Sequence, residues 1–153
     1  MDLILWRHAE AEPVQGGMDD MERRLNAKGE RQAERMAAWL EHRIAHSTRI
    51  LVSPAQRCQQ TAKRLGRKFQ TLAELSPEGS AEALLAAAGW PLASKPVLVI
   101  GHQPTLGIAA SLALDGQAQH RPIRKAGVWW IRSRERENER HVILHAVQMP
   151  DGL

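Results

Sequence analysis

Short apolar runs separated by amphipathic stretches dominate the hydrophobic pattern of this chain. Continuous apolar runs are typical of strands that are buried on both faces of a sheet. The clearest runs are "LILW" near the start and "VLVI" near the middle, while a charged turn separates the last two. The predicted strands cover residues 2–6, 49–52, 70–72, 96–102, 127–133 and 141–148.

The intervening stretches carry apolar residues three and four positions apart, which is the spacing of one helix face. Asn26 is a favourable N-cap for the first helix, over residues 26–45, and Ser53 caps the second, with Pro54 at its first helical position. That second helix runs to about residue 67, and two shorter ones cover about 80–88 and 105–114.

Strands and helices therefore alternate along the sequence. This order predicts an α/β fold with a mainly parallel sheet, to which the last two strands add an antiparallel edge. The length of 153 residues is enough for one packed domain and too short for two ordinary ones. We expect a single three-layer α/β/α sandwich over residues 1–153.

Composition limits the cellular location and the partners expected for this domain. No apolar run is long enough to span a membrane, and the start lacks the features of a signal peptide, so we expect a cytoplasmic protein without a membrane partner. The single cysteine, Cys58, fits a reducing compartment. The net charge of +4 and the pI of about 9.8 indicate anionic partners without naming their class. The arginine and acidic residues of "IRSRERENER" are typical of a solvated hairpin.

Basic residues follow three of the predicted strands. They are Arg7-His8, Arg57 just after Ser53-Pro54, and His102 after Gly101. In a parallel sheet with right-handed crossovers, these turns emerge at the same carboxyl edge. Arginine offers planar paired donors to phosphate oxygens, and histidine can act as a nucleophile or a donor. The sequence thus predicts a phosphoryl-binding crevice at this edge.

The same segments resemble the histidine phosphatase superfamily, with its phosphoglycerate mutase-like fold. The resemblance rests on "LWRHAEAE", "VSPAQRCQQTA" and "VIGHQPTLG", which occur in the family's order. Arg23, Leu25, Gly29 and the segment Glu74–Pro77 also match the SixA-type phosphohistidine phosphatases, a short bacterial branch.

The resemblance implies a role for each matching residue. His8 would be the nucleophile that accepts the phosphoryl group, Arg7 and Arg57 would bind its oxygens, and His102 would donate to them. Arg23 would lie at the pocket rim. The implied reaction is hydrolysis through a phosphohistidine enzyme intermediate, without a cofactor or metal. The implied substrate is phosphohistidine in a signalling or phosphotransfer protein, bound in an open site.

Two matching positions raise questions. The family glycine after the catalytic histidine is Ala9 here, which would be strained if the position needed a positive φ, although we expect the methyl group to be tolerated. Glu74 is the candidate proton donor to the leaving group, with Glu78 next, but phosphohistidine already has a good leaving group and so can dispense with one.

Other interpretations stay open. A phosphatase of small phosphorylated metabolites is the main alternative, and a basic nucleic-acid-binding module is another, although we expect no nucleic-acid partner. Cys58 and Arg64 have the spacing of a cysteine phosphatase, but no glycine lies between them to form a phosphate-binding loop. His141 and His145 could ligate a metal only in a site with more partners. The sequence indicates no particular oligomeric state.

Overall fold

A six-stranded sheet runs through the centre of the computed structural model, which describes residues 1–153. Its strand order is β3-β2-β4-β1-β5-β6, where β3, β2, β4 and β1 are parallel and β5 and β6 are antiparallel. This confirms the predicted mixed sheet. The strands are β1 (Asp2–Arg7), β2 (Arg49–Val52), β3 (Gln70–Thr71), β4 (Val97–Gly101), β5 (Val128–Arg136) and β6 (Glu139–Gln148).

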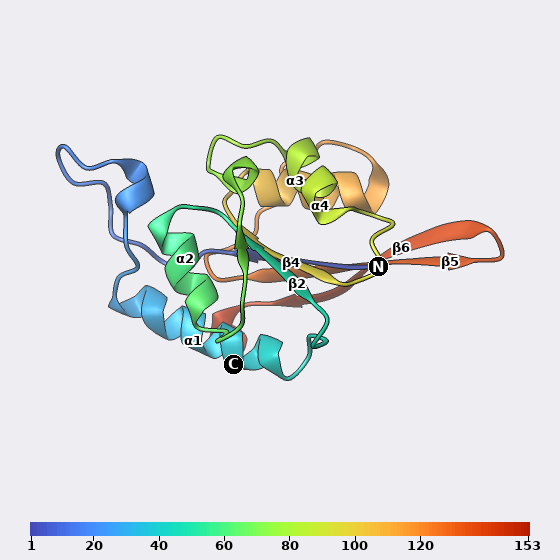
Figure 1. Cartoon of the computed structure of the whole chain (residues 1–153), viewed down its shortest axis with the longest axis horizontal. Helices are drawn as coiled ribbons and strands as arrows, with labels where there is room; N and C mark the ends of the chain where they lie inside the picture. Colours follow the sequence, from blue (N-terminus) through green and yellow to red (C-terminus); the bar gives the residue numbers. More distant parts are fainter.

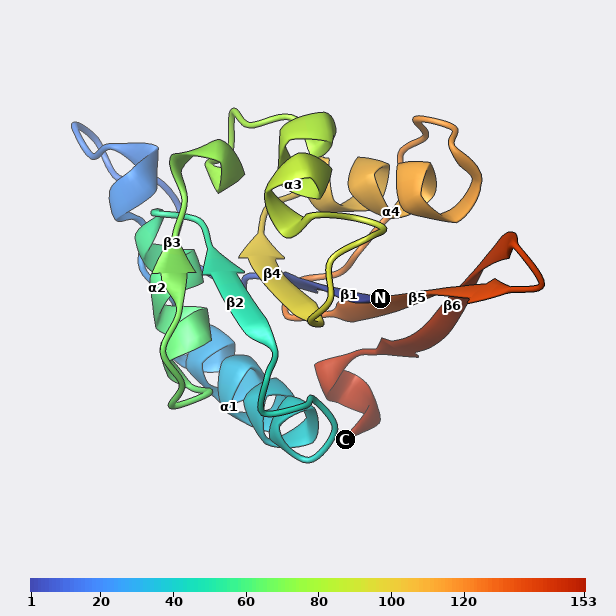
Figure 2. The same cartoon turned by 45° about the vertical axis from the view of Figure 1, so that its right-hand side comes forward.

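Helices cover both faces of the sheet (Figures 1 and 2). On one face lie α1 (Ala27–Glu41) and α2 (Gln56–Lys63), and on the other lie α3 (Ala81–Ala88) and α4 (Thr105–Asp115). Ile4 and Trp6 of β1 pack in the cluster under α1 and α2, whereas Leu3 and Leu5 pack under α3 and α4. Alternate residues of a strand point to opposite faces, so β1 is apolar throughout because both its faces are covered. None of the helices is long and apolar enough to cross a membrane.

Two helix boundaries differ from the sequence expectation. Asn26 caps α1 as predicted, its Oδ1 accepting the Gly29 N–H at 2.8 Å, but the helix ends at Glu41. Ile44 is still buried, because a turn delivers it to the core. The second helix begins at Gln56 and ends at Lys63. Ser53 is not its N-cap, because the N-cap position falls on Ala55; the Ser53 hydroxyl accepts from the Ala55 N–H at 3.2 Å and also contacts a histidine of the site described below.

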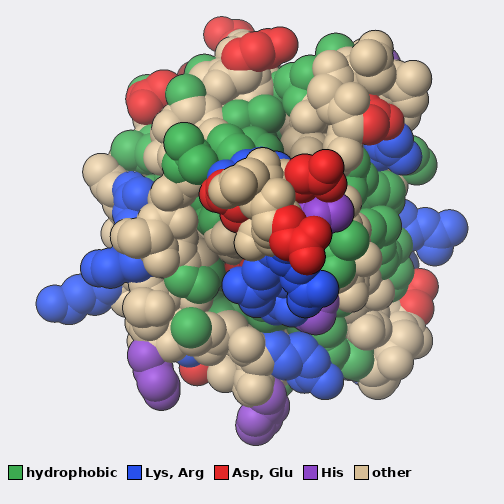
Figure 3. Space-filling view, turned by 90° about the vertical axis from the view of Figure 1, so that its right-hand side faces the viewer, with side chains coloured by type: hydrophobic (Ala, Val, Ile, Leu, Met, Phe, Trp, Pro, Cys, Tyr) green, Lys and Arg blue, Asp and Glu red, His purple; other side chains and the backbone are tan.

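The hairpin of β5 and β6 extends beyond the rest of the sheet (Figure 1). Its turn residues Glu137 and Asn138 both have positive φ, of 52° and 68°, as a two-residue hairpin turn of type I′ requires. Charged side chains of both signs gather at the tip, which faces the viewer in Figure 3. The predicted solvated hairpin is therefore confirmed.

The turns between elements include three short 3-10 helices. They are η1 (Asp20–Glu22), between β1 and α1, η2 (Ala73–Leu75), between β3 and α3, and η3 (Pro150–Gly152), after β6. The first two follow the carboxyl ends of parallel strands, so they lie at the edge of the sheet where the basic residues emerge.

Candidate active site

Two histidines meet at the carboxyl edge of the sheet. Arg7, the last residue of β1, pairs in register with Gly101, the last residue of β4, so His8 and His102 leave neighbouring strands side by side. Their ring centroids are 5.4 Å apart. Parallel pairing thus brings together two residues that are 94 positions apart in the chain (102 − 8).

Arg57 joins the histidines from the first turn of α2. Its Nη2 lies 3.4 Å from Nδ1 of His102, and the residue is only 3% exposed. Arg7 approaches from β1, and its Nη1 donates to the Ile123 carbonyl at 3.0 Å. The Nε atoms of both arginines are buried and have no hydrogen-bond partner. Unsatisfied buried donors are costly, and two of them on cationic groups indicate a place for an anion.

His8 is held uncharged with one ring nitrogen free. Its Nδ1 lies 2.7 Å from the Ala9 carbonyl, which can only accept, so Nδ1 carries the proton and Nε2 keeps its lone pair. The pKa of His8 is lowered to about 3. Burial is the main cause, the hydrogen bond to Ala9 opposes it, and neighbouring positive charges add to it. At neutral pH His8 therefore presents an unprotonated nitrogen, as a nucleophile must.

Ser53 controls the second histidine. Its Oγ lies 2.8 Å from Nε2 of His102, while Nδ1 of the same ring faces the donor Arg57. Burial, followed by the charge of Arg57, lowers the pKa of His102 to about 4. When Nδ1 of His102 accepts from Arg57, the ring proton lies on Nε2, which donates to Ser53 Oγ. When Ser53 donates to Nε2 instead, the ring proton lies on Nδ1 and can be donated to a phosphoryl oxygen. A hydroxyl can fill either role, so Ser53 permits the donor function expected of His102.

Asp20 connects Arg57 to Arg23. The carbonyl and carboxylate of Asp20 accept from Nη1 and Nη2 of Arg57 at 2.8 and 3.0 Å. The other carboxylate oxygen lies 3.3 Å from Nη1 of Arg23, whose Nε donates to the Glu12 carbonyl. Partial burial raises the pKa of Asp20, but the hydrogen bonds and charges of both arginines outweigh it and leave the pKa below its usual value. Arg23 thus reaches the cluster through Asp20.

The site is more covered than the sequence led us to expect. His8, Arg57 and His102 are 6%, 3% and 4% exposed, so the expectation of an open site is wrong for this structure. The segment with η1 places Asp20 directly on Arg57. Beside it, Asp20 and Glu78 line a cavity of about 310 Å³ between η1 and the turn after η2. Of the residues in this network, Asp20 alone lines the cavity, which therefore borders the cluster only through Asp20.

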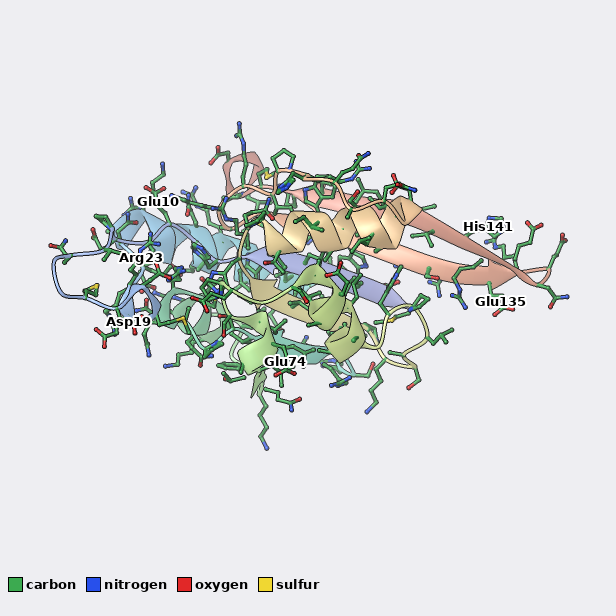
Figure 4. All side chains as sticks on the ribbon, turned by 90° about the horizontal axis from the view of Figure 1, so that it is seen from above. Glu10, Asp19, Arg23, Glu74, Glu135 and His141 are labelled. Atoms are coloured by element: carbon green, nitrogen blue, oxygen red, sulfur yellow. The ribbon has the colours of Figure 1, made fainter.

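Glu74 does not join the cluster. It lies on η2, is exposed, and its carboxylate makes neither an ion pair nor a hydrogen bond. Figure 4 places it away from Asp19 and Arg23, on the side of α3. Glu78, the second candidate donor, lines the cavity beside Asp20. Of the two acids suggested by the sequence, Glu78 is the one that shares a cavity with the site.

The loop after His8 is unstrained. Ala9 is absent from the residues with positive φ, which outside glycine are Ala126, Glu137 and Asn138. Its N–H donates to Thr61 Oγ1 at 3.1 Å, so the methyl group is accommodated. Gly29 matters more, because a Cβ there would stand 1.9 Å from the Glu10 carbonyl. Only glycine lets α1 pack this closely on the loop that carries His8.

Cys58 sits in the same region but cannot replace His8. Its thiol is fully buried, and burial raises its pKa to about 12, although the charge of Arg57 opposes this. The reactive form of cysteine is the thiolate, which is therefore scarce at neutral pH. The structure also contains no cluster of three or more histidine, cysteine, aspartate or glutamate side chains placed to hold a metal.

Sequence reasoning missed two residues of this network. Asp20 and Ser53 each bind a predicted site residue directly, at 3.0 and 2.8 Å. A signal existed for Asp20, since it stands three positions before Arg23, at pairing distance on one helical turn. Ser53 was interpreted as a helix cap, because its position before Pro54 favours one, and only the start of α2 at Gln56 excludes that role.

An α/β sheet with an uncharged histidine among arginines at its carboxyl edge defines a phosphoryl-transfer enzyme. Comparisons with known proteins agree. The model of the histidine phosphatase superfamily (branch 1) matches residues 3–80. A protein of Picosynechococcus sp. is 36% identical over 141 residues, covering 87% of this chain and 86% of the relative.

Solved structures extend the likeness to nearly the whole chain. A crystal structure described as the phosphohistidine phosphatase SixA of Agrobacterium tumefaciens has a TM-score of 0.78 at 25% identity, covering 97% of each chain. The protein histidine phosphatase SixA complexed with tungstate has a TM-score of 0.76 at 24% identity, covering 99% of each. The chain belongs to the histidine phosphatase superfamily, in its SixA-type branch, and is a histidine-nucleophile phosphatase.

Proposed function

We propose that this protein hydrolyses phosphohistidine in a signalling or phosphotransfer protein, with His8 as the nucleophile. One observation carries the assignment of His8: its Nδ1 proton is fixed on the Ala9 carbonyl, so the free Nε2 belongs to an uncharged ring beside Arg57 and His102. In the proposed first step, Nε2 of His8 forms a bond to phosphorus as the P–N bond of the substrate breaks, and the substrate ring, protonated at its other nitrogen, leaves as neutral imidazole. Water then attacks the phosphohistidine and releases inorganic phosphate.

The surrounding cations supply most of the stabilisation in this scheme. Arg7 and Arg57 each hold a buried Nε–H without a partner, which phosphoryl oxygens would satisfy. His102 donates through Nδ1 once Ser53 donates to its Nε2. Removing one well-placed donor of this kind typically costs about 3 kcal/mol of barrier. Because the groups are already positioned by β1, β4 and α2, little reorganisation is needed during transfer.

The Asp20 carboxylate must move away from Arg57 before a phosphoryl group can bind there. Its carboxylate holds Nη2 of Arg57 at 3.0 Å, yet its own side chain is 45% exposed, so it can turn outward into water. In this role Asp20 balances the charge of two arginines while the site is free of phosphate. The phosphoryl group then replaces it as their anionic partner.

The phosphohistidine assignment is supported by the character of the leaving group. No acid makes a hydrogen bond to His8, whose ring contacts the Ala9 carbonyl. An imidazole leaves from phosphorus without strong acid assistance, whereas an alkoxide does not. A site without a placed acid therefore favours phosphohistidine over phosphate esters.

Small phosphorylated metabolites remain the second candidate, and the covered site favours them. The cavity of about 310 Å³ beside Asp20 has the size for a small molecule, and η1 places Asp20 on Arg57. A direct comparison of kcat/KM on a phosphohistidine-containing protein and on phosphoserine or sugar phosphates separates the two. Faster turnover of the small esters would overturn the phosphohistidine proposal and leave the role of His8 standing.

The nucleophile is tested with a ³²P-labelled phosphohistidine protein and quenching without acid. We expect label on the wild-type chain and on the His120→Ala variant, and none on His8→Ala. His120 is the matched control because it is exposed and makes no side-chain hydrogen bond. Labelling of His8→Ala to the wild-type level would refute the assignment of His8.

A further inference from the structure

A second cavity, of about 340 Å³, lies at the opposite edge of the sheet from His8. Three of its residues mark the amino ends of parallel strands: Asp2 begins β1, Thr48 precedes β2 and Pro96 precedes β4. The far wall comes from α1 and from the antiparallel strands β5 and β6. None of the residues assigned above to phosphoryl transfer borders it. This cavity is larger than the one beside Asp20, and the phosphatase reaction does not use it.

Two tryptophans and a histidine form an aromatic wall in this cavity. Trp39 of α1 and Trp130 of β5 meet edge to face, with ring centroids 6.5 Å apart at 85°. His145 of β6 approaches Trp130 with centroids 5.3 Å apart. A β-bulge places it there: Trp130 pairs with Ala146 and Ile131 with Leu144, so His145 is the extra residue. Bulges re-aim side chains in this way, often beside binding sites.

Polar atoms without partners line the same cavity. The hydroxyl of Thr48 is buried, in a residue 9% exposed, and makes no hydrogen bond. Trp130 Nε1 is also buried and makes no hydrogen bond of normal geometry, although it is close enough to Asp2 to lower the pKa of that carboxyl. Most buried polar groups in proteins are paired. A ligand that accepts from Thr48 and Trp130 would satisfy both.

The charge balance of the cavity favours an anion. Arg132 is neutralised by Asp2, which accepts from its Nε and Nη2 at 2.8 and 3.0 Å. Arg43 has no acidic partner: its guanidinium lies 4.5 Å from the centre of the Trp39 ring, and its Nη1 donates to the Trp39 carbonyl. Its remaining N–H groups are available at the mouth, because the side chain is exposed. One uncompensated positive charge therefore sits on the aromatic wall.

We propose that this cavity binds a small planar aromatic molecule that carries a single carboxylate. The ring would pack against Trp39 and Trp130, and the carboxylate would lie between Arg43 and the unpartnered hydroxyl of Thr48. The volume is at the lower end of small-molecule pockets, which fits one or two fused rings. Aromatic stacking and a charge-assisted hydrogen bond together supply recognition of both ring and charge.

The test uses three probes with the same ring and different charge: indole-3-acetate, indole-3-acetamide and tryptamine. The full-length ¹⁵N-labelled protein has five tryptophans, whose indole N–H signals report binding. We expect indole-3-acetate to shift the Trp130 signal saturably, with the amide about tenfold weaker and tryptamine weaker still, since a hydrogen bond to a charged group is worth about 1.5–3 kcal/mol. Trp129 is the internal control, because its Nε1 is also unpartnered but packs on the other face of β5.

Two exposed arginines on or next to α1 give a matched pair of variants. Arg43→Gln should weaken indole-3-acetate about tenfold and leave the amide unchanged, whereas Arg35→Gln should alter neither, because Arg35 lies outside the cavity. Equal affinity for all three probes, equal shifts of Trp129 and Trp130, or an unchanged affinity in Arg43→Gln would each overturn the proposal. The measurement does not depend on phosphatase activity, so it stands or falls independently of His8.

Discussion

Each edge of the sheet carries an arginine held by an aspartate through two hydrogen bonds, but the two pairs are buried in opposite senses. At the carboxyl edge the side chain of Arg57 is 4% exposed and that of Asp20 is 45% exposed. At the amino edge Arg132 is 24% exposed and Asp2 is 14% exposed. The more exposed partner is therefore the acid at one edge and the base at the other.

This difference in burial distinguishes Arg57–Asp20, an ion pair that a ligand can open, from Arg132–Asp2, an ion pair that stabilises the fold. Asp20 can leave Arg57 for water at small cost, and the buried arginine then needs another anion. Asp2 cannot leave Arg132 without remaining partly buried and unpaired, which is costly. An ion pair at an active site is therefore recognised by which partner is buried, not by its distance, which is 3.0 Å for Arg57 and 2.8 Å for Arg132.

Replacing the buried base at the carboxyl edge should have the largest effect. Lysine at position 57 keeps a positive charge but cannot contact two atoms of Asp20 or of a phosphoryl group with a planar fork. We expect Arg57→Lys to lower kcat/KM about a hundredfold or more. Steady-state kinetics on a phosphohistidine protein measure this, with Arg35→Lys on the exposed face of α1 as the control. A loss below about threefold would contradict the proposed contact of Arg57 with the phosphoryl group.

The same edge should make stability depend on pH. His8 and His102 have pKa values lowered to about 3 and 4 in the folded state, against an ordinary 6.5. Their neutral forms stabilise the fold fully above pH 6.5, and this contribution is lost as pH falls, because the unfolded chain binds protons first. Urea unfolding should show the free energy of unfolding falling by about 3 kcal/mol between pH 6.5 and 5. In the His8→Asn variant, the free energy of unfolding should fall about half as much over the same pH range. A fall equal to that of the wild type would contradict a buried neutral His8.

Neutralising the acid of each pair tests the comparison directly. Asp20→Asn removes the exposed competitor for Arg57, so inorganic phosphate should bind about three- to tenfold more tightly, with little change in stability. Asp2→Asn should leave phosphate binding unchanged and lower the free energy of unfolding by about 1–3 kcal/mol, because Arg132 loses its partner. Calorimetric titration and urea unfolding measure the two quantities. If both variants behaved alike, burial would not be what distinguishes the pairs.

The smallest effect is expected at Cys58. Its raised pKa leaves the thiol protonated, so Cys58→Ala should keep kcat within about twofold of the wild type while costing roughly 1 kcal/mol of packing. A loss as large as that of Arg57→Lys would point to cysteine chemistry instead. Reaction progress and thermal unfolding of the same preparation separate lost activity from lost structure.

The class of the fold and the core of the site were readable from the sequence for a local reason. Apolar runs of three or four residues bounded by turn residues favour strands covered on both faces, and parallel strands end at the same edge of the sheet, so the residues after β1, β2 and β4 were expected to converge. His8, Arg57 and His102 each follow such a run within five residues. Their meeting is a consequence of strand direction, which the hydrophobic pattern already contains.

Tertiary structure alone decided which groups those residues would bind. Ser53 was predicted to cap a helix, but α2 begins later, at Gln56, and the Ser53 hydroxyl contacts His102. Asp20 lies in a crossover segment whose path no periodic pattern describes. The same holds for the cavity between Trp39 and Trp130, which depends on a bulge at His145 that shifts the face of one side chain. Contacts between irregular segments depend on the path of the chain through space, which no repeated sequence pattern describes. The burial and direction of the strands, by contrast, follow from apolar runs that recur along the sequence.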